Sequence, residues 1–142
     1  MRYIILVSHG TVAPALENAM SMIIGRQKNV LAVGMKDGMG ADAYTESFRK
    51  LVEDIKSEDR ILLLSDLAEG SPMTNAVRVL AERDLMKNTI AFAGMNLPMV
   101  ITAAMLEDGM VDADEIEQAV LQESRLQLRV VKFGETEDDE EI

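Results

Sequence analysis

Four short apolar runs, separated by segments with helical periodicity, restrict how this chain folds more than any other feature. The runs lie at 3–7, 30–35, 61–64 and 89–93. Strands that alternate with helices predict a parallel sheet, because right-handed crossovers return each strand in the same direction. The third run has no polar position, which is typical of a strand covered on both faces. We therefore predict an α/β fold, a single doubly wound domain with a four-stranded parallel sheet flanked by helices.

The segments between these runs carry helix signals. Helices are expected to begin near five positions: Pro14, Ala41, Ser71, Pro98 and Asp112. The first should close at Gly25 and the third should run to about Arg83, while Asp112 and Glu115 suggest a capping box. The second should turn five residues inward: Tyr44, Phe48, Leu51, Val52 and Ile55.

The C-terminal part of the chain divides into an apolar run and an acidic end. Residues 126–133 are expected to form a last strand that pairs antiparallel at the sheet edge, on the same subunit or on a neighbour. After Gly134 the chain has six acidic residues and no basic one, within a net charge of −11. We expect 1–133 to be the folded domain and 134–142 to be a disordered tail. Nucleic acid is not an expected partner, because binding to its phosphates depends mainly on positive charge.

Compartment and redox chemistry follow from what the sequence lacks. There is no cysteine, which excludes disulfides, thiolate catalysis and iron–sulfur ligation. The N-terminal apolar run is too short for a signal peptide or a membrane span. We therefore expect a cytoplasmic protein.

His9 is the only histidine and directly follows the first apolar run. One imidazole does not make a multi-histidine metal site, so we expect no metal, but it can carry a phosphoryl group. A lone histidine is often just hydrogen-bonded to local backbone. Its place at a strand end beside Gly10 favours a functional role, because ligands gather at that edge of open α/β sheets.

Two further strand ends are expected at the same edge, Asp66 after the third strand and Asn96 after the fourth. If the first and third strands are adjacent, Asp66 lies beside His9. A carboxylate bonded to one ring nitrogen fixes the tautomer and leaves the other nitrogen free to attack phosphorus. The alternative for Asp66 is an ordinary loop or capping aspartate.

Gly70-Ser71-Pro72 adds a candidate anion site. Ser71 is a suitable N-cap and Pro72 a suitable first helical residue, which would leave the N–H groups of Met73 and Thr74 free. A helix start of this kind binds anions, although most such caps are only structural. The chain has no Walker sequence and no G-x-G-x-x-G, so we expect no nucleotide cofactor and a phosphoryl donor that is itself a protein.

Three ordered segments resemble the mannose-family enzyme IIA domain of the bacterial phosphoenolpyruvate-dependent sugar phosphotransferase system. The segments are Ile4–Gly10, then Ser65–Pro72 followed by Asn75-Ala76, and Ala93–Met99. The resemblance extends over about residues 1–133. It implies that His9 accepts a phosphoryl group from the phosphocarrier HPr and passes it to an enzyme IIB domain. It also implies that Asp66 orients the imidazole and that Ser71 helps to hold the phosphoryl group.

The resemblance further implies a homodimer in which the final strand, 126–133, is exchanged between subunits. Because no IIB domain follows the acidic tail, IIB is expected to be a separate polypeptide, with the membrane IIC and IID proteins as indirect partners. One departure is Glu69, where the family often has a small residue, and an acid there would repel phosphate unless it faces solvent.

Other readings of the same fold are less compatible with the residues. A receiver domain needs an acidic pair after the first strand, and chelatases and histidine phosphatases need a second histidine. The phosphocarrier subunit of dihydroxyacetone kinase and a non-catalytic regulatory module remain as alternatives.

Overall fold

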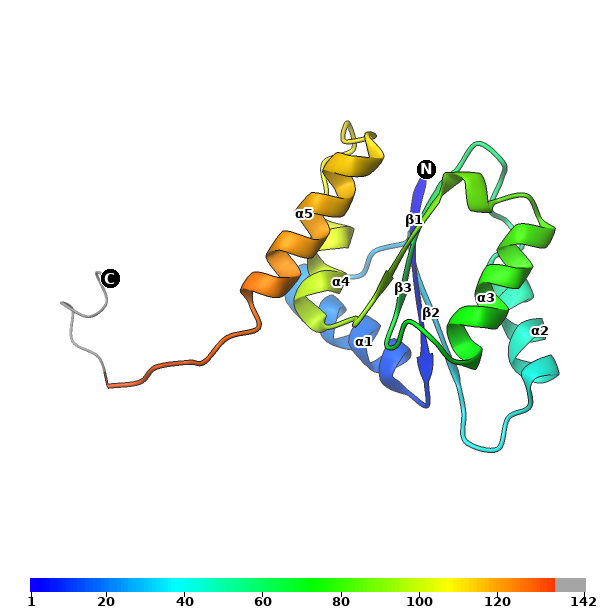
Figure 1. The fold of residues 1–142 in the computed structure, drawn as a ribbon, viewed down its shortest axis with the longest axis horizontal. Coiled ribbons are helices and arrows are strands. Elements are labelled where there is room, and N and C mark those ends of the chain that lie inside the picture. The colour runs from blue at the N-terminus through cyan, green and yellow to red at the C-terminus, as the bar shows by residue number, and fades with distance from the viewer. Residues whose placement is uncertain (135–142) are drawn as a thin grey trace.

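The computed structural model describes residues 1–134 of the 142-residue chain and has the predicted α/β architecture (Figure 1). Four parallel strands form one sheet in the order β2-β1-β3-β4. In chain order the elements are β1 (Arg2–His9), α1 (Val12–Ile24), β2 (Val30–Met35), α2 (Ala41–Leu51), β3 (Arg60–Ser65), α3 (Ser71–Glu82), a 3-10 helix (Met86–Asn88), β4 (Thr89–Ala93), α4 (Leu97–Ala104) and α5 (Ala113–Leu126).

Helices cover both faces of the sheet, α1, α4 and α5 on one side and α2 and α3 on the other (Figure 1). The side chains of β1 divide between two cores, because successive residues of a strand point to opposite faces. Ile4 and Leu6 belong to the core under α1, α4 and α5, whereas Ile5 and Val7 belong to the core under α2 and α3. Burial on both faces explains why these strands are apolar at consecutive positions.

The helix boundaries differ in detail from those expected. Helix α1 begins at Val12, two residues before Pro14, which is compatible with proline because the first turn needs no N–H donor. Helix α2 ends at Leu51, although Ile55 is still buried through a turn that the Ile55 N–H closes on the Val52 carbonyl.

The expected last strand is not formed within the chain. Helix α5 keeps its buried positions at helical spacing as far as Ser124 and includes Leu126. The following residues, 127–133, leave the body of the protein without pairing with a strand (Figure 1). Leu128 and Phe133 are 84% and 85% exposed. The structure therefore does not show the alternative in which residues 126–133 pair antiparallel with the sheet of the same subunit.

The acidic tail expected at 134–142 lies outside the described residues, apart from Gly134. Over residues 1–134, none of the helices has the length and apolar character needed to cross a membrane.

Candidate functional site

His9 and Asp66 lie together at the carboxyl edge of the sheet. The strands β1 and β3 are neighbours, with Val7 beside Ser65, so the residues that follow meet at this edge. Asp66 Oδ2 accepts hydrogen bonds from the backbone N–H of His9 at 2.9 Å and lies 3.0 Å from His9 Nδ1. The carboxylate therefore fixes both the backbone and the ring of the histidine.

The protonation of this pair follows from the other contacts of Asp66. Burial alone would raise the pKa of Asp66, but hydrogen bonds from His9 and from the Leu67 N–H lower it below its ordinary value. An ionised carboxylate only accepts hydrogen bonds, so His9 Nδ1 carries the proton. The lone pair of a neutral imidazole is then on Nε2.

Gly70 packs against the Nε2 edge of the imidazole. A methyl group added to Gly70 would lie 3.1 Å from His9 Cε1 and 3.3 Å from Nε2. Gly70 also has φ +121°, a conformation that side chains rarely adopt. The His9 side chain is 50% exposed, so its free nitrogen faces both the start of α3 and solvent.

The start of α3 differs from the prediction by one residue. Gly70 rather than Ser71 is the N-cap, and Ser71 is the first helical residue, without a side-chain capping bond. The glycine conformation sets this start, because it turns the chain into the helix one residue earlier. The Thr74 N–H donates to the Gly70 carbonyl at 3.0 Å and is not free, contrary to expectation. Within residues 1–134, the N–H groups of Ser71 and Met73 have no hydrogen-bond acceptor.

Gly10 and Gly34 shape the turn that follows His9. Gly10 has φ +56°, and its N–H donates to the Met35 carbonyl at 2.8 Å. Gly34 lies directly beneath this turn, since a methyl group on it would overlap the Gly10 carbonyl oxygen at 1.9 Å. No local sequence pattern indicates this close approach, because only the pairing of β1 with β2 creates it.

Two other residues singled out from the sequence stand apart from the His9–Asp66 pair. Asn96 caps α4, with its Oδ1 accepting from the Met99 N–H at 2.8 Å. It follows β4, which is separated from β1 by β3, and within residues 1–134 it makes no hydrogen bond to His9 or Asp66. Glu69 is exposed and makes no hydrogen bond or ion pair with any residue of the described range.

Tyr44 is a residue of this region for which the sequence predicted only a core role. It is buried in α2, and its hydroxyl donates to the Pro72 carbonyl in the first turn of α3 at 2.9 Å. Its inward position was predicted from helical spacing. The hydroxyl contact depends on the packing of α2 against α3, which periodicity does not specify.

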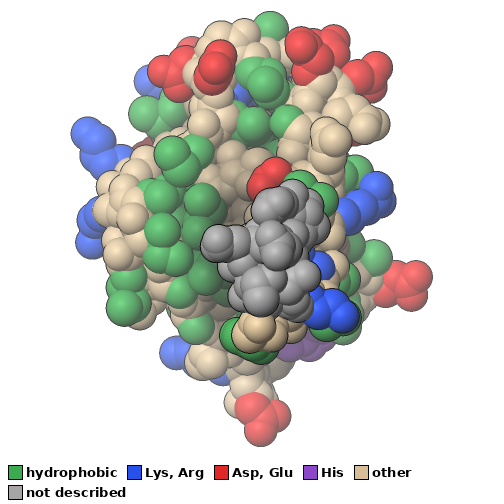
Figure 2. All heavy atoms as spheres, turned by 90° about the vertical axis from the view of Figure 1, so that its left-hand side faces the viewer, with side chains coloured by type: hydrophobic (Ala, Val, Ile, Leu, Met, Phe, Trp, Pro, Cys, Tyr) green, Lys and Arg blue, Asp and Glu red, His purple; other side chains and the backbone are tan. Residues whose placement is uncertain are grey.

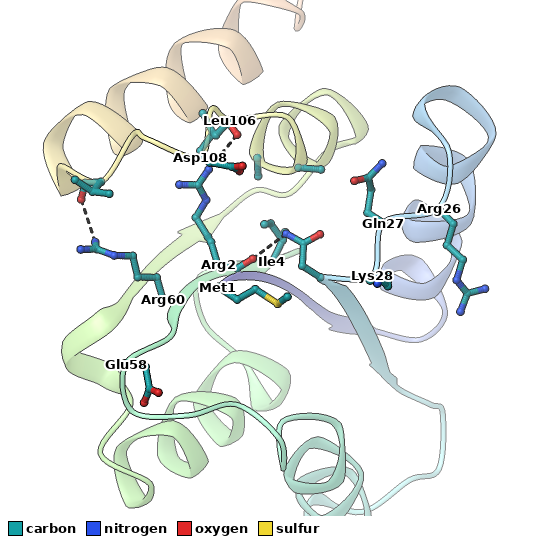
Figure 3. Close-up of a pocket in the computed structure, with 14 residues that line it drawn as sticks. Met1, Arg2, Ile4, Arg26, Gln27, Lys28, Glu58, Arg60, Leu106 and Asp108 are labelled. Carbon is teal, nitrogen blue, oxygen red and sulfur yellow. Dashed lines mark hydrogen bonds between the residues drawn. The ribbon is translucent and has the colours of Figure 1, made fainter.

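A cavity of about 720 Å³ lies at the opposite, amino end of the strands (Figure 3). Arg2 and Arg60 line it, but their guanidinium groups are bonded to backbone carbonyls of the loop between α4 and α5. Arg2 Nη1 donates to Met110 at 2.8 Å and Arg60 Nη1 donates to Val111 at 3.0 Å. These arginines therefore fasten that loop to the starts of β1 and β3.

Comparison with known proteins finds relatives that share one description. The family model described as PTS system fructose IIA component matches residues 3–121. A PTS system fructose-specific EIIA component of Bacillus subtilis (strain 168) is 30% identical over 111 residues, covering 78% of this chain and 74% of that protein. A PTS system mannose-specific EIIAB component of Escherichia coli (strain K12) is 25% identical over 129 residues, covering 91% of this chain but only 39% of that protein.

A solved structure supports the same assignment. The phosphotransferase system component EIIA from Streptococcus agalactiae superposes with a TM-score of 0.77 at 26% sequence identity. The superposition covers 94% of this chain and 98% of that one. The chain therefore belongs to the EIIA-man family, the mannose-type IIA components of the phosphotransferase system.

Proposed function

We propose that His9 is a phosphohistidine carrier that accepts a phosphoryl group from HPr and passes it to an enzyme IIB component. The observation that carries this proposal is the His9–Asp66 pair. Its hydrogen bond at Nδ1 leaves Nε2 as a nucleophile that faces solvent, where a protein donor has access. The chain would thus act as the phosphotransferase component of a sugar uptake system.

The transfer needs few groups on this chain. The lone pair of Nε2 forms a bond to phosphorus while the bond from phosphorus to the donor atom breaks, and that donor atom keeps the electron pair. The ring then carries positive charge between the phosphoryl group and Nδ1. Asp66 stabilises this charge through the existing hydrogen bond, and the reverse reaction on IIB uses the same geometry.

The start of α3 supplies the complementary interactions with the phosphoryl oxygens. The unpaired N–H groups of Ser71 and Met73 lie at the positive end of the helix, which favours an anion. The Ser71 hydroxyl is exposed and provides one more donor. Gly70 lets this helix start approach Nε2 closely, because it has no side chain.

The proposed partners follow from this relay. HPr is the donor and a IIB component is the acceptor, so that the IIA domain meets the membrane IIC and IID proteins only indirectly. We place the relay in the cytoplasm. The sugar is set by those partners, as the fructose and mannose names of the relatives illustrate.

We also propose a homodimer in which residues 126–133 pair with the partner's sheet. This segment exposes five large apolar side chains: Leu126, Leu128, Val130, Val131 and Phe133. Hydrophobic side chains also gather on the surface formed by α1, α4 and α5 (Figure 2). Met22 and Ile23 of α1 are exposed as well. Exposed apolar surface of this extent is typical of a protein–protein interface.

The relay is tested by incubating the chain with phosphoenolpyruvate, enzyme I and HPr. Intact-mass measurement should show the gain of one phosphoryl group, and the phosphate should be acid-labile. His9→Ala removes the only histidine and should abolish labelling. Failure of the wild-type chain to label, or persistent labelling of the variant, would contradict the proposal and favour a regulatory module.

A further inference from the structure

The buried tyrosine of α2 makes an unusual contact with the start of α3. The Tyr44 ring has no solvent exposure, and its hydroxyl donates to the Pro72 carbonyl at 2.9 Å. Within residues 1–134, no other hydrogen bond joins a different element to the segment 69–74. Over the described residues, Tyr44 thus donates the one tertiary hydrogen bond that holds the segment 69–74 beside His9.

The contact has a direct consequence for one N–H group. The Pro72 carbonyl and the Met73 N–H belong to the same planar peptide group and point in opposite directions. Pro72 lies in the first turn of α3, so the helix already directs this peptide, and the hydrogen bond from Tyr44 helps to hold that direction. It also polarises the peptide so that the Met73 N–H becomes a stronger donor. This is one of the two unpaired donors at the start of α3.

The preceding peptide is held in a different way. Asn75 Nδ2 donates to the Ser71 carbonyl at 2.9 Å, and Arg78 Nη2 in turn donates to Asn75 Oδ1 at 2.7 Å. The nitrogen of the Ser71–Pro72 peptide belongs to proline and carries no hydrogen. The Asn75 contact therefore acts on a peptide without an N–H donor, whereas the Tyr44 contact acts on the peptide that carries the Met73 N–H.

We propose that Tyr44 is a positioning residue for phosphoryl transfer, and that its hydroxyl aims and strengthens the Met73 N–H that contacts the phosphoryl group on His9. This inference rests on the proposed function of His9. Burial raises the pKa of Tyr44, and the negative charge of Asp66 raises it further. The hydroxyl therefore keeps its proton, and with it the hydrogen bond, at any pH at which the protein works.

The matched substitutions Tyr44→Phe and Tyr3→Phe test the inference, because the chain has only two tyrosines. The Tyr3 hydroxyl makes no hydrogen bond with any described residue, and Tyr3 lies at the start of β1, far from His9. With saturating phosphorylated HPr, Tyr44→Phe should slow labelling about fivefold, the effect of weakening one hydrogen bond in the transition state. The KM for HPr should not change, and Tyr3→Phe should label at the wild-type rate.

A second measurement observes the Met73 N–H directly, first in the wild-type chain and then in the two variants. In ¹H–¹⁵N spectra of the wild-type chain, the Met73 amide resonance should move downfield when His9 is phosphorylated. The shift should be smaller in Tyr44→Phe and unchanged in Tyr3→Phe. A Met73 resonance that does not respond, or a Tyr44→Phe variant that labels normally, would overturn the inference while leaving the relay intact. Absence of labelling in the wild-type chain would instead overturn the relay itself.

Discussion

Replacing Gly34 by alanine should disturb the turn that carries His9, although the two residues are on different strands. The added methyl group would lie 1.9 Å from the Gly10 carbonyl oxygen, whereas ordinary contact begins at 3.4 Å. The turn or the strand β2 must therefore move by about 1.5 Å. That movement stretches the hydrogen bond from the Gly10 N–H to the Met35 carbonyl, now 2.8 Å long.

The expected change in the free energy of unfolding follows from two destabilising effects and one stabilising effect. Overpacking a well-packed site costs about 1–3 kcal/mol, and loss of the hydrogen bond costs about 1 kcal/mol more. Alanine is favoured over glycine within a strand by about 0.5–1 kcal/mol, which offsets part of this loss. The steric term is larger, so Gly34→Ala should lower the free energy of unfolding by about 1–3 kcal/mol.

Urea denaturation of Gly34→Ala and of the control Gly109→Ala measures this difference. Gly109 has open space where a methyl group would be and no positive φ, so its substitution should be neutral or slightly stabilising. Labelling of His9 should also slow in Gly34→Ala, because the displaced turn begins at Gly10, directly after His9. A Gly34→Ala protein with wild-type stability and a wild-type labelling rate would show that the turn accommodates the methyl group, and the reasoning would be refuted.

Three further predictions concern the Asp66 carboxylate and the C-terminal segment. Asp66→Asn should slow labelling of His9 by about ten- to a hundredfold, which is the effect of removing a carboxylate that orients a metal-bound histidine. The control Asp54→Asn, at an exposed position, should label at the wild-type rate. Folding lowers the pKa of Asp66, so its carboxylate stabilises the protein above about pH 4 and this contribution is lost as the pH falls through the folded value. The stability difference between wild type and Asp66→Asn, measured by denaturation, should therefore narrow in acid, and a constant difference would contradict the assignment. Deletion of 127–142 should convert the proposed dimer to a monomer, whereas deletion of 135–142 alone should leave it a dimer. Light scattering measures both masses, and the same oligomeric state for the two deletion variants would refute strand exchange.

The sheet and the position of His9 at its carboxyl edge could be predicted because both depend on local sequence pattern. Consecutive apolar residues specify a strand buried on both faces, and a polar residue after such a run marks its carboxyl end. The runs that end before His9 and Asp66 therefore located both residues, and adjacency of β1 and β3 then placed them in contact. The bounds expected for β2 and β4 agree with the structure for the same reason.

Features that depend on contacts between elements could not be read from the same pattern. Ser71 has the residue type of an N-cap, yet the backbone conformation of Gly70 places the cap one residue earlier. Gly34 looks like an ordinary strand residue until β2 lies beside the turn at Gly10. Residues 126–133 alternate like a strand but have no partner within the subunit, since strand formation needs a neighbouring edge as well as a suitable sequence.

The candidate site consists of two halves that are held by different parts of the fold. His9 and Asp66 follow adjacent strands, so the sheet itself sets their distance. Ser71 and Met73 belong to a helix start that is anchored from α2 through Tyr44. If His9 carries a phosphoryl group as proposed, substitutions in the first half should change the nucleophilicity of Nε2, whereas substitutions in the second should change the stabilisation of that group. The two halves meet where Gly70 approaches the imidazole, so a side chain at this position would disturb both at once.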